Sequence, residues 1–358
     1  MVAVISAVVV ISILIFVHEL GHFTFAKLFK VKVLIFSLGF GPAILKKKFG
    51  ETEYRLSILP LGGYVKMVGE SLDETDDPIP PEDQARSYAT QSNWKKLLIL
   101  VAGPLSNWIF AVFLLWIVFM RGVPYMTTTI GEVKQGSPAY SAGIQKGDTI
   151  VQINGVKVNE WDAMKKIIVG NADKNMVLTI LRDNKPFTVN VKPRMETEKD
   201  IFGEPVKTPI IGIIPAGDYE VKKSNPVAAV SLAGKESVSI SYLVALSLVK
   251  LVEGKIPTKD LGGPILIAQQ AAHQAKRGIE ALMYFMALIS INFAVLNILP
   301  IPVLDGGNVL FTLIEAAIRK PINKKLKVAI LQLGVLFIIL LTVFVFYNDI
   351  SRIITSHH

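Results

Sequence analysis

The sequence contains no cysteine, so disulfide bonds contribute nothing to its fold, and the redox character of its compartment stays open. Charged residues are also scarce: they make up 19% of the 358 residues, against 51% hydrophobic residues and a mean hydropathy of +0.47. This composition is typical of a polytopic α-helical membrane protein that has enough remaining chain for one small extramembrane domain.

Histidine is rare as well, with five residues in the chain. We interpret the terminal pair, His357 and His358, as the remnant of an expression tag, which leaves His18, His22 and His273. The net charge is +9. Because no basic stretch is interleaved with aromatic residues, we expect this excess to report membrane orientation, and we expect no nucleic-acid partner.

Four apolar runs are predicted to cross the membrane, because each is long enough at 1.5 Å per residue: residues 2–29, 93–121, 281–304 and 328–347. The first run is too long for a cleaved signal peptide and lacks a basic start and a small-residue cleavage site. Residues 223–280 are also apolar, but Lys235 and Glu236 interrupt them. This pattern favours amphipathic helices on the membrane surface over a fifth span.

Between the spans, residues 33–48 and 52–68 are predicted to form short strands, and residues 70–83 a surface loop. Residues 122–222 alternate short apolar runs with turn signals, which predicts a soluble α/β domain. Basic residues cluster after the first span, before the second, and between the third and fourth. We therefore expect those places to be cytoplasmic, with the 122–222 domain and both termini on the extracytoplasmic side.

The first span contains the motif HELGH, residues 18–22. Residues four apart share a helix face, so His18 and His22 can bind one metal ion, while Glu19 can reach a water molecule that the ion activates. This is the arrangement of zinc peptidases. A glutamate within a span costs about 2.5–3.5 kcal/mol without partners, so a functional role for Glu19 is the favoured interpretation.

A catalytic zinc ion needs a third protein ligand. His273 lies in a polar stretch, AAHQAKRG, and is interpreted as a surface residue. Asp305 is the better candidate, because it is the only acidic residue between Glu280 and Glu315, and two prolines break the helix just before it. If the first and third spans run in parallel, His18 and Asp305 lie at similar depths. The alternative is that Asp305 caps the helix that follows it.

Three segments together resemble the site-2 protease family: HELGH, AGPLSN at 102–107, and NILPIPVLDGG at 297–307. More narrowly, they resemble the bacterial RseP-type intramembrane zinc metalloproteases. The resemblance implies that His18, His22 and Asp305 bind Zn²⁺ and that Glu19 is the general base. It implies a substrate-binding role for another set of residues: Asn292, Asn297, Pro300, Pro302, Gly62, Gly63, Tyr64, Val65 and Lys66.

In this family the segments that match GFGP at 39–42 and LPLGGYVKM at 59–67 form a membrane-reentrant hairpin and an edge strand. An edge strand can pair with a substrate helix once that helix unwinds. The resemblance implies a protease of the bacterial inner membrane that cuts single-span membrane proteins, such as anti-sigma factors or remnant signal peptides, after a prior extracytoplasmic cleavage.

The stretch GSPAYSAGIQKGDTIVQINGVKV, residues 136–158, resembles PDZ domains, which bind extended peptides by strand addition. The best-studied RseP-type pattern carries two such domains, and only one is visible here, so a two-domain size filter does not carry over. Residues 223–280 are a further hypothesis, as a gate beside the active site.

Two other functions remain open from the residues. A membrane transporter or sensor would hold a cation at His18, His22 and Asp305 without hydrolysis, and would leave Glu19 dispensable apart from its charge. It would also predict an inverted repeat, which the sequence does not show. An inactive scaffold with a working PDZ domain would predict the loss of a zinc ligand, yet all three candidates are present.

Overall fold

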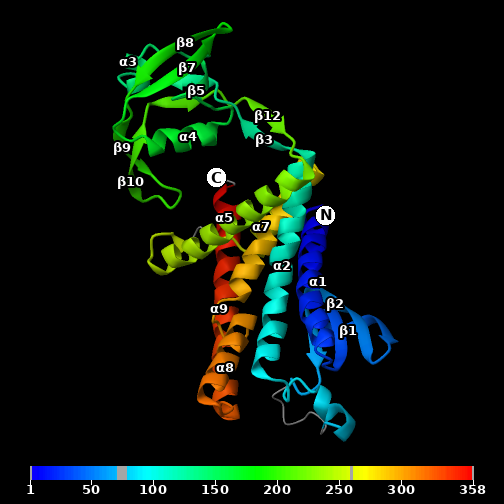
Figure 1. Cartoon of the computed structure of the whole chain (residues 1–358). Helices are drawn as coiled ribbons and strands as arrows, with labels where there is room; N and C mark the ends of the chain where they lie inside the picture. The colour runs from blue at the N-terminus through cyan, green and yellow to red at the C-terminus, as the bar shows by residue number, and fades with distance from the viewer. Residues whose placement is uncertain (1, 71–78, 259–260, 357–358) are drawn as a thin grey trace. The chain divides into compact units, whose positions relative to one another are not determined.

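The computed structural model describes residues 2–70, 79–258 and 261–356 (Figure 1). The chain forms two compact units. The first contains residues 1–118, 227–249 and 257–358, and the second contains residues 119–226 and 250–256. We describe each unit by itself.

The first unit is built from helices, whose bounds are α1 (Val2–Leu28), α2 (Asn93–Arg121), α5 (Pro226–Val252), α6 (Pro264–Arg277), α7 (Ile279–Asn297), α8 (Asp305–Ile318) and α9 (Lys324–Ser356). Within the described residues, five of them (α1, α2, α5, α7 and α9) are long and apolar enough to cross a membrane. This is one more than the four predicted spans, and the additional candidate is α5. Figure 1 shows α5 crossing α2 and α7 obliquely.

The third predicted span, residues 281–304, is wrong at its end. Helix α7 stops at Asn297, and residues 298–304 form an irregular segment before α8 begins at Asp305. Two prolines in this segment, Pro300 and Pro302, cannot donate to a helix ladder. Val303 adopts a φ of 88°, which a β-branched residue rarely does. The segment therefore turns the chain sharply just before the predicted third ligand.

The predicted short strands are instead one long hairpin of β1 (Val33–Phe49) and β2 (Thr52–Met67). Residues 35–38 of β1 pair with residues 63–66 on one side and with residues 53–56 on the other. The last part of β2, residues 63–67, is thus an outer edge of this sheet within the described residues. Its core packs against the end of α1 through Ala26, Val33 and Val65.

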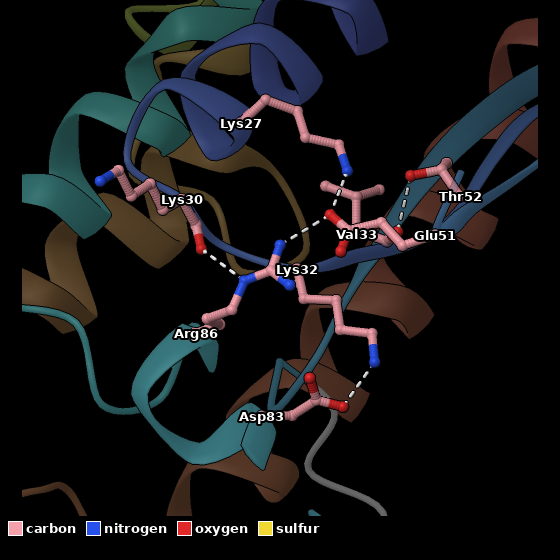
Figure 2. A network of polar contacts seen from close by, with 8 residues as sticks. All are labelled: Lys27, Lys30, Lys32, Val33, Glu51, Thr52, Asp83 and Arg86. Carbon is pink, nitrogen blue, oxygen red and sulfur yellow. Dashed lines mark hydrogen bonds and ion pairs between the residues drawn. The ribbon is translucent and has the colours of Figure 1, made fainter. Parts of the chain in front are cut away.

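A polar network ties this hairpin to α1 and to the 3₁₀ helix η1 (Pro81–Arg86) (Figure 2). Glu51 accepts hydrogen bonds from Lys27 and Arg86 at 2.6 and 2.7 Å, and Lys32 pairs with Asp83. Asp83 is buried. Of the predicted surface loop, residues 80–82 are exposed, whereas its last residue, Asp83, is buried within η1, and residues 71–78 lie outside the described residues.

The second unit contains the predicted 122–222 segment. A four-stranded sheet has the order β6–β5–β7–β8, from β5 (Thr149–Ile153), β6 (Val156–Lys157), β7 (Met176–Arg182) and β8 (Lys185–Val191). The other strands form three two-stranded sheets. These are β3 (Val123–Met126) with β12 (Tyr219–Lys222), β4 (Ile130–Val133) with β11 (Ile213–Pro215), and β9 (Arg194–Lys199) with β10 (Pro205–Ile210). Two helices, α3 (Pro138–Ser141) and α4 (Trp161–Gly170), complete the unit. Its core is aliphatic, with Ile150, Ile153 and Leu178 fully buried.

Both ends of α5 are held within this second unit. Before the helix, the backbone N–H of Ser224 donates to the carbonyl of Phe119 at 3.0 Å. At its other end, Lys250 and Lys255 pair with Glu204, which lies between β9 and β10. The middle of α5 belongs to the first unit, where Trp108 Nε1 donates to Ser241 Oγ at 3.3 Å.

Candidate metal and catalytic site

Helix α1 presents its two histidines on one face, one turn apart. The Nε2 atoms of His18 and His22 lie 3.2 Å from each other. A contact at the other ring nitrogen orients His22, because its Nδ1 lies 2.8 Å from the carbonyl oxygen of Ile99 on α2. Metal-binding histidines in proteins are usually held in this way through their second ring nitrogen.

The structure brings Asp305 to the same point. Its Oδ2 atom lies 3.1 Å from His18 Nε2, and its Oδ1 atom lies 3.4 Å from His22 Nε2. Asp305 is the first residue of α8, and its side chain contacts the two histidines. The carboxylate is directed at the histidines, so the alternative interpretation of Asp305 as a helix cap does not hold.

These three residues fit a zinc ion. Zinc–ligand distances of about 2.0–2.1 Å in tetrahedral geometry place neighbouring ligand atoms about 3.4 Å apart. The three separations of 3.1, 3.2 and 3.4 Å match that spacing. Asp305 Oδ2 is buried without a hydrogen-bond partner, which is an unfavourable state that a cation would relieve. Two nitrogens and one carboxylate also leave the fourth position of a tetrahedral ion for water or substrate.

Glu19 lies beside these residues and is 9% exposed. It lines a cavity of about 260 Å³. The edge strand approaches it closely: a Cβ atom on Gly63 would lie 3.0 Å from Glu19 Cγ and 2.9 Å from the carbonyl oxygen of Ser37. Glycine at position 63 therefore lets the strand and the candidate base share one small space.

The structure brings only part of the predicted substrate-binding set to this cavity. Its walls include Gly63, Tyr64, Val65 and Asn297. Gly62, Lys66, Asn292, Pro300 and Pro302 do not line it. The Asn292 amide instead donates to the carbonyl of Leu288 within α7, at 2.9 Å. Pro302 packs against Gly334 of α9, where a Cβ atom would lie 2.7 Å from the proline ring.

Sequence reasoning missed several residues of the site. Asn308 lines the cavity one turn after Asp305, and its spacing of three from the aspartate is the signal that indicates a shared helix face. Gly103 of α2 abuts both histidines. His273, in contrast, is exposed and stands apart from the cavity, as the polar stretch around it indicates.

Glu70 was also missed, and it lines both the catalytic cavity and a neighbouring cavity of about 640 Å³ that contains Lys96, Glu315 and Lys327. The protein atoms around the Glu70 carboxylate displace solvent, and this desolvation raises the pKa of Glu70 to about 7. A hydrogen bond from the Met67 N–H at 3.0 Å acts in the opposite direction and lowers the pKa. Nothing in the local sequence predicts this placement, because it depends on α2, α8 and α9.

Comparison with known proteins shows the family to which the sequence belongs. The sequence model of Peptidase family M50 matches residues 6–341. A protein of Campylobacter jejuni named "Putative zinc metalloprotease Cj1068" is 38% identical over 351 residues, covering 98% of this chain and 93% of the relative. "Putative zinc metalloprotease mll0638" of Mesorhizobium japonicum is 34% identical over 354 residues, covering 95% of this chain and 96% of the relative.

A solved PDZ domain, from the SdrC-like protein of Listeria innocua, is 23% identical over 25% of this chain and 92% of that chain, with a TM-score of 0.20. The names of the full-length relatives agree with the expectation of zinc as the cofactor. The family match and the relatives above 30% identity over nearly the whole chain confirm the resemblance to site-2 proteases drawn from the motifs. This chain is a member of peptidase family M50.

Proposed function

We propose that this protein is an intramembrane zinc endopeptidase that cleaves the transmembrane segments of single-span membrane proteins. One observation carries the proposal: His18, His22 and Asp305, from helices α1 and α8, converge with tetrahedral spacing beside Glu19. His18, Glu19 and His22 lie in α1, a helix apolar enough to cross a membrane, where an ionisable residue is costly and its presence indicates a function.

In this proposal each residue has a distinct role. His18, His22 and Asp305 hold zinc, which when bound supplies a Lewis acid that acidifies water and polarises the scissile carbonyl. Glu19 takes the proton of the attacking water and passes it to the leaving amide nitrogen. Asn297 lines the cavity and is the candidate to donate a hydrogen bond to the carbonyl oxygen as negative charge develops there.

The edge of β2 offers a way to hold a substrate. The scissile amides of a helical substrate are hidden in its own hydrogen bonds, and a strand edge can pair with the chain once it unwinds. Residues 63–67 run along the catalytic cavity and pair with β1 on one side. We propose that the other side receives the substrate, with Tyr64 and Val65 forming side-chain contacts.

The outer part of the hairpin supports a location at the membrane. It exposes Phe40, Ile44, Leu45 and Phe49, and Lys46, Lys47 and Lys48 lie among them. Apolar side chains beside lysines are typical of segments at the lipid interface.

We propose four membrane spans, with α5 lying along the membrane surface. Helices α1 and α7 both run toward the metal site, because His18 and His22 lie near the C-terminal end of α1 and Asp305 follows α7. Two spans that run in the same direction must be separated by an odd number of crossings. Helix α2 is one such crossing, and α6 is not among the helices long and apolar enough to cross, so α5 cannot add a single crossing of its own.

The same arrangement assigns the sides of the membrane. We propose a cytoplasmic metal site in a bacterial inner membrane and an extracytoplasmic 122–222 domain, and the basic residues that follow α1 and precede α9 support this orientation. We propose that this domain is a PDZ domain that can bind an extended peptide, and that substrates arrive after a first extracytoplasmic cleavage. A gating role for residues 223–280 remains a hypothesis.

The test is cleavage of a model single-span substrate by the purified wild type and by Glu19→Gln, with zinc content measured in both. We expect zinc in both proteins and cleavage only by the wild type, because the substitution removes the base and leaves the metal ligands. Equal cleavage by both proteins would contradict the role of Glu19. Zinc in both and cleavage by neither, across several substrates, would favour a cation transporter or sensor.

A further inference from the structure

Besides the atom already noted on Asp305, three buried side-chain atoms in the described part of the chain have no hydrogen-bond partner: His18 Nδ1 and both amide atoms of Asn107. Asn107 lies in the middle of α2 and is completely buried. A buried, unpaired amide costs about 1–3 kcal/mol, and in a membrane no water competes to relieve it. A residue with this cost requires an explanation that the proposed roles above do not supply.

The full set of such atoms in the described residues is His18 Nδ1, Asn107 Nδ2, Asn107 Oδ1 and Asp305 Oδ2, four atoms with Asp305 included. Two of the three residues are proposed zinc ligands. The unpaired polar atoms are therefore confined to the proposed metal ligands and to one asparagine on the neighbouring helix.

The packing of α1 on α2 indicates that Asn107 lies close to His18. The two helices are antiparallel neighbours, and His22 Nδ1 faces the carbonyl of Ile99 at 2.8 Å. One turn back along α1 is His18, and one turn forward along α2 is Gly103. A Cβ atom on Gly103 would lie 2.8 Å from His18 Cε1, the ring carbon between Nδ1 and Nε2.

Asn107 is one further turn along the same face of α2. Side chains in a helix lean toward its N-terminus, so we expect the Asn107 amide to lie over Gly103, since Cβ positions four residues apart are about 5–6 Å from each other. Gly103 has no side chain to fill that space. The helix is also fixed at this turn, because Ser290 Oγ of α7 donates to the Asn107 carbonyl at 2.7 Å.

The chemistry of the two groups is complementary. A histidine that binds a metal through Nε2 carries its proton on Nδ1, and this N–H is normally donated to a fixed acceptor. His22 has such an acceptor in Ile99, and His18 lacks a hydrogen bond at the corresponding atom. The Asn107 amide oxygen is an acceptor without a partner.

We propose that Asn107 is a positioning residue for the zinc ligand His18, whose Nδ1–H it accepts through one bridging water. This contact holds the tautomer that presents Nε2 to the metal. The inference rests on the proposed zinc site. It adds an outer-shell contact from α2, so that each histidine of the site is oriented by a different turn of the same helix.

The test is the zinc dissociation constant of the purified full-length protein, measured by competition with a chelator. We expect Asn107→Leu, which removes the acceptor at similar volume, to weaken zinc binding by about 10–100-fold. Asn107→Asp keeps an acceptor and should stay close to the wild type. Ser290→Ala is the matched control, because it removes a hydrogen bond to the same turn of α2 without changing the amide.

The outcomes separate this inference from the proposed function. If Asn107→Leu lost cleavage while its zinc dissociation constant stayed within about twofold of the wild-type value, the positioning role would be wrong and the peptidase could still stand. A wild type that bound no zinc would overturn both. Should Asn107→Leu fail to fold, Asn107→Ala against Asn107→Asp gives the same comparison.

Discussion

At the scale of single residues, Gly103 sets how closely α2 approaches the proposed metal ligands. A Cβ atom at this position would lie 2.3 Å from His22 Nε2 and 2.8 Å from His18 Cε1. Both distances are shorter than any real contact, so Gly103→Ala must push the imidazoles out of place. Because misplacement of about 1 Å can cost about 100-fold in rate, we expect cleavage to fall by at least that factor.

The matched control is Gly234→Ala in α5, where a Cβ atom would meet nothing within 4 Å. Alanine favours a helix over glycine by about 0.5–1 kcal/mol, so this variant should keep full cleavage and equal or higher stability. The measurements are the initial rate on one substrate and the zinc content of both variants. Wild-type activity and zinc content in Gly103→Ala would show that the ligands are not held as described.

In the second unit, the buried carboxylate of Asp148 makes stability depend on pH. Burial alone would raise the pKa of Asp148, but hydrogen bonds from Arg182 Nε at 2.7 Å and from the Gln145 N–H at 2.8 Å outweigh it and hold the pKa below its ordinary value of 3.8. A lowered pKa means that the stabilisation is fully present above about pH 4 and is lost as the pH falls through the folded-state value.

We therefore expect Asp148→Asn to destabilise the 122–222 domain by about 2 kcal/mol at pH 7, and by less at more acidic pH, since protonation already weakens the wild-type pair. Hydrogen exchange of β5 and β7 peptides in the full-length protein measures the effect. Asp173→Asn, at an exposed position, is the control. The argument would be contradicted if the difference in exchange rate between Asp148→Asn and the wild type were the same at pH 7 and below pH 4.

Sequence reasoning at this scale succeeded where the signal is local and failed where it is not. The spacing of His18 and His22 predicts their shared face, and the isolated position of Asp305 after two prolines made it the best third ligand; the structure brings all three together. Gly103 and Asn107 lie in AGPLSN, a segment that supports the family resemblance, but no residue spacing in it indicates a contact with the metal ligands. Their importance comes from the antiparallel packing of α1 on α2, which a single sequence does not specify.

At the scale of elements, Asp349 of α9 holds the start of α6. Its carboxylate accepts hydrogen bonds from the backbone N–H groups of Gly263, Ile265 and Leu266, at 2.9, 3.0 and 3.2 Å. Asp349 is 2% exposed. The first N–H groups of a helix have no partner within the helix, and a negative charge there is favourable.

We expect Asp349→Ala to loosen α6 by about 2 kcal/mol, because three backbone donors lose their acceptor at once. Hydrogen exchange of residues 263–277 in the full-length protein should become faster, while zinc content stays at the wild-type level because the metal ligands lie elsewhere. Asp349→Asn keeps one oxygen acceptor, so its exchange rate should lie between those of the wild type and Asp349→Ala. Unchanged exchange in Asp349→Ala would show that α6 is held by other contacts.

The elements themselves were predictable to different degrees. Long apolar runs predict α1 and α2 well, because their composition leaves few alternatives. The double pairing of residues 35–38 could not be predicted, since it joins three stretches of chain that each look like an ordinary short strand. Helix α5 is ambiguous for a different reason: its length and composition suit a span, and the argument against a span depends on contacts between residues far apart in the sequence.

At the scale of the whole molecule, the number of spans decides which side of the membrane each segment occupies. With four spans, the α5–α6 connection shares the side of the 122–222 domain. With α5 as a fifth span, that connection would lie on the other side, and α7 would then run opposite to α1. A carboxylate following α7 could not then reach the histidines near the end of α1, contrary to the 3.1 Å separation of Asp305 and His18.

The absence of cysteine makes this a direct experiment, because each substitution introduces a single thiol. We expect a membrane-impermeant maleimide, applied to spheroplasts, to label Lys146→Cys and Thr258→Cys, and to label Lys47→Cys and Lys320→Cys only after the membrane is permeabilised. All four positions are exposed, so accessibility in the fold does not limit the reaction. Thr258→Cys is decisive, since it follows α5. If it reacted only after permeabilisation, together with Lys47→Cys, α5 would cross the membrane and the four-span arrangement would be wrong.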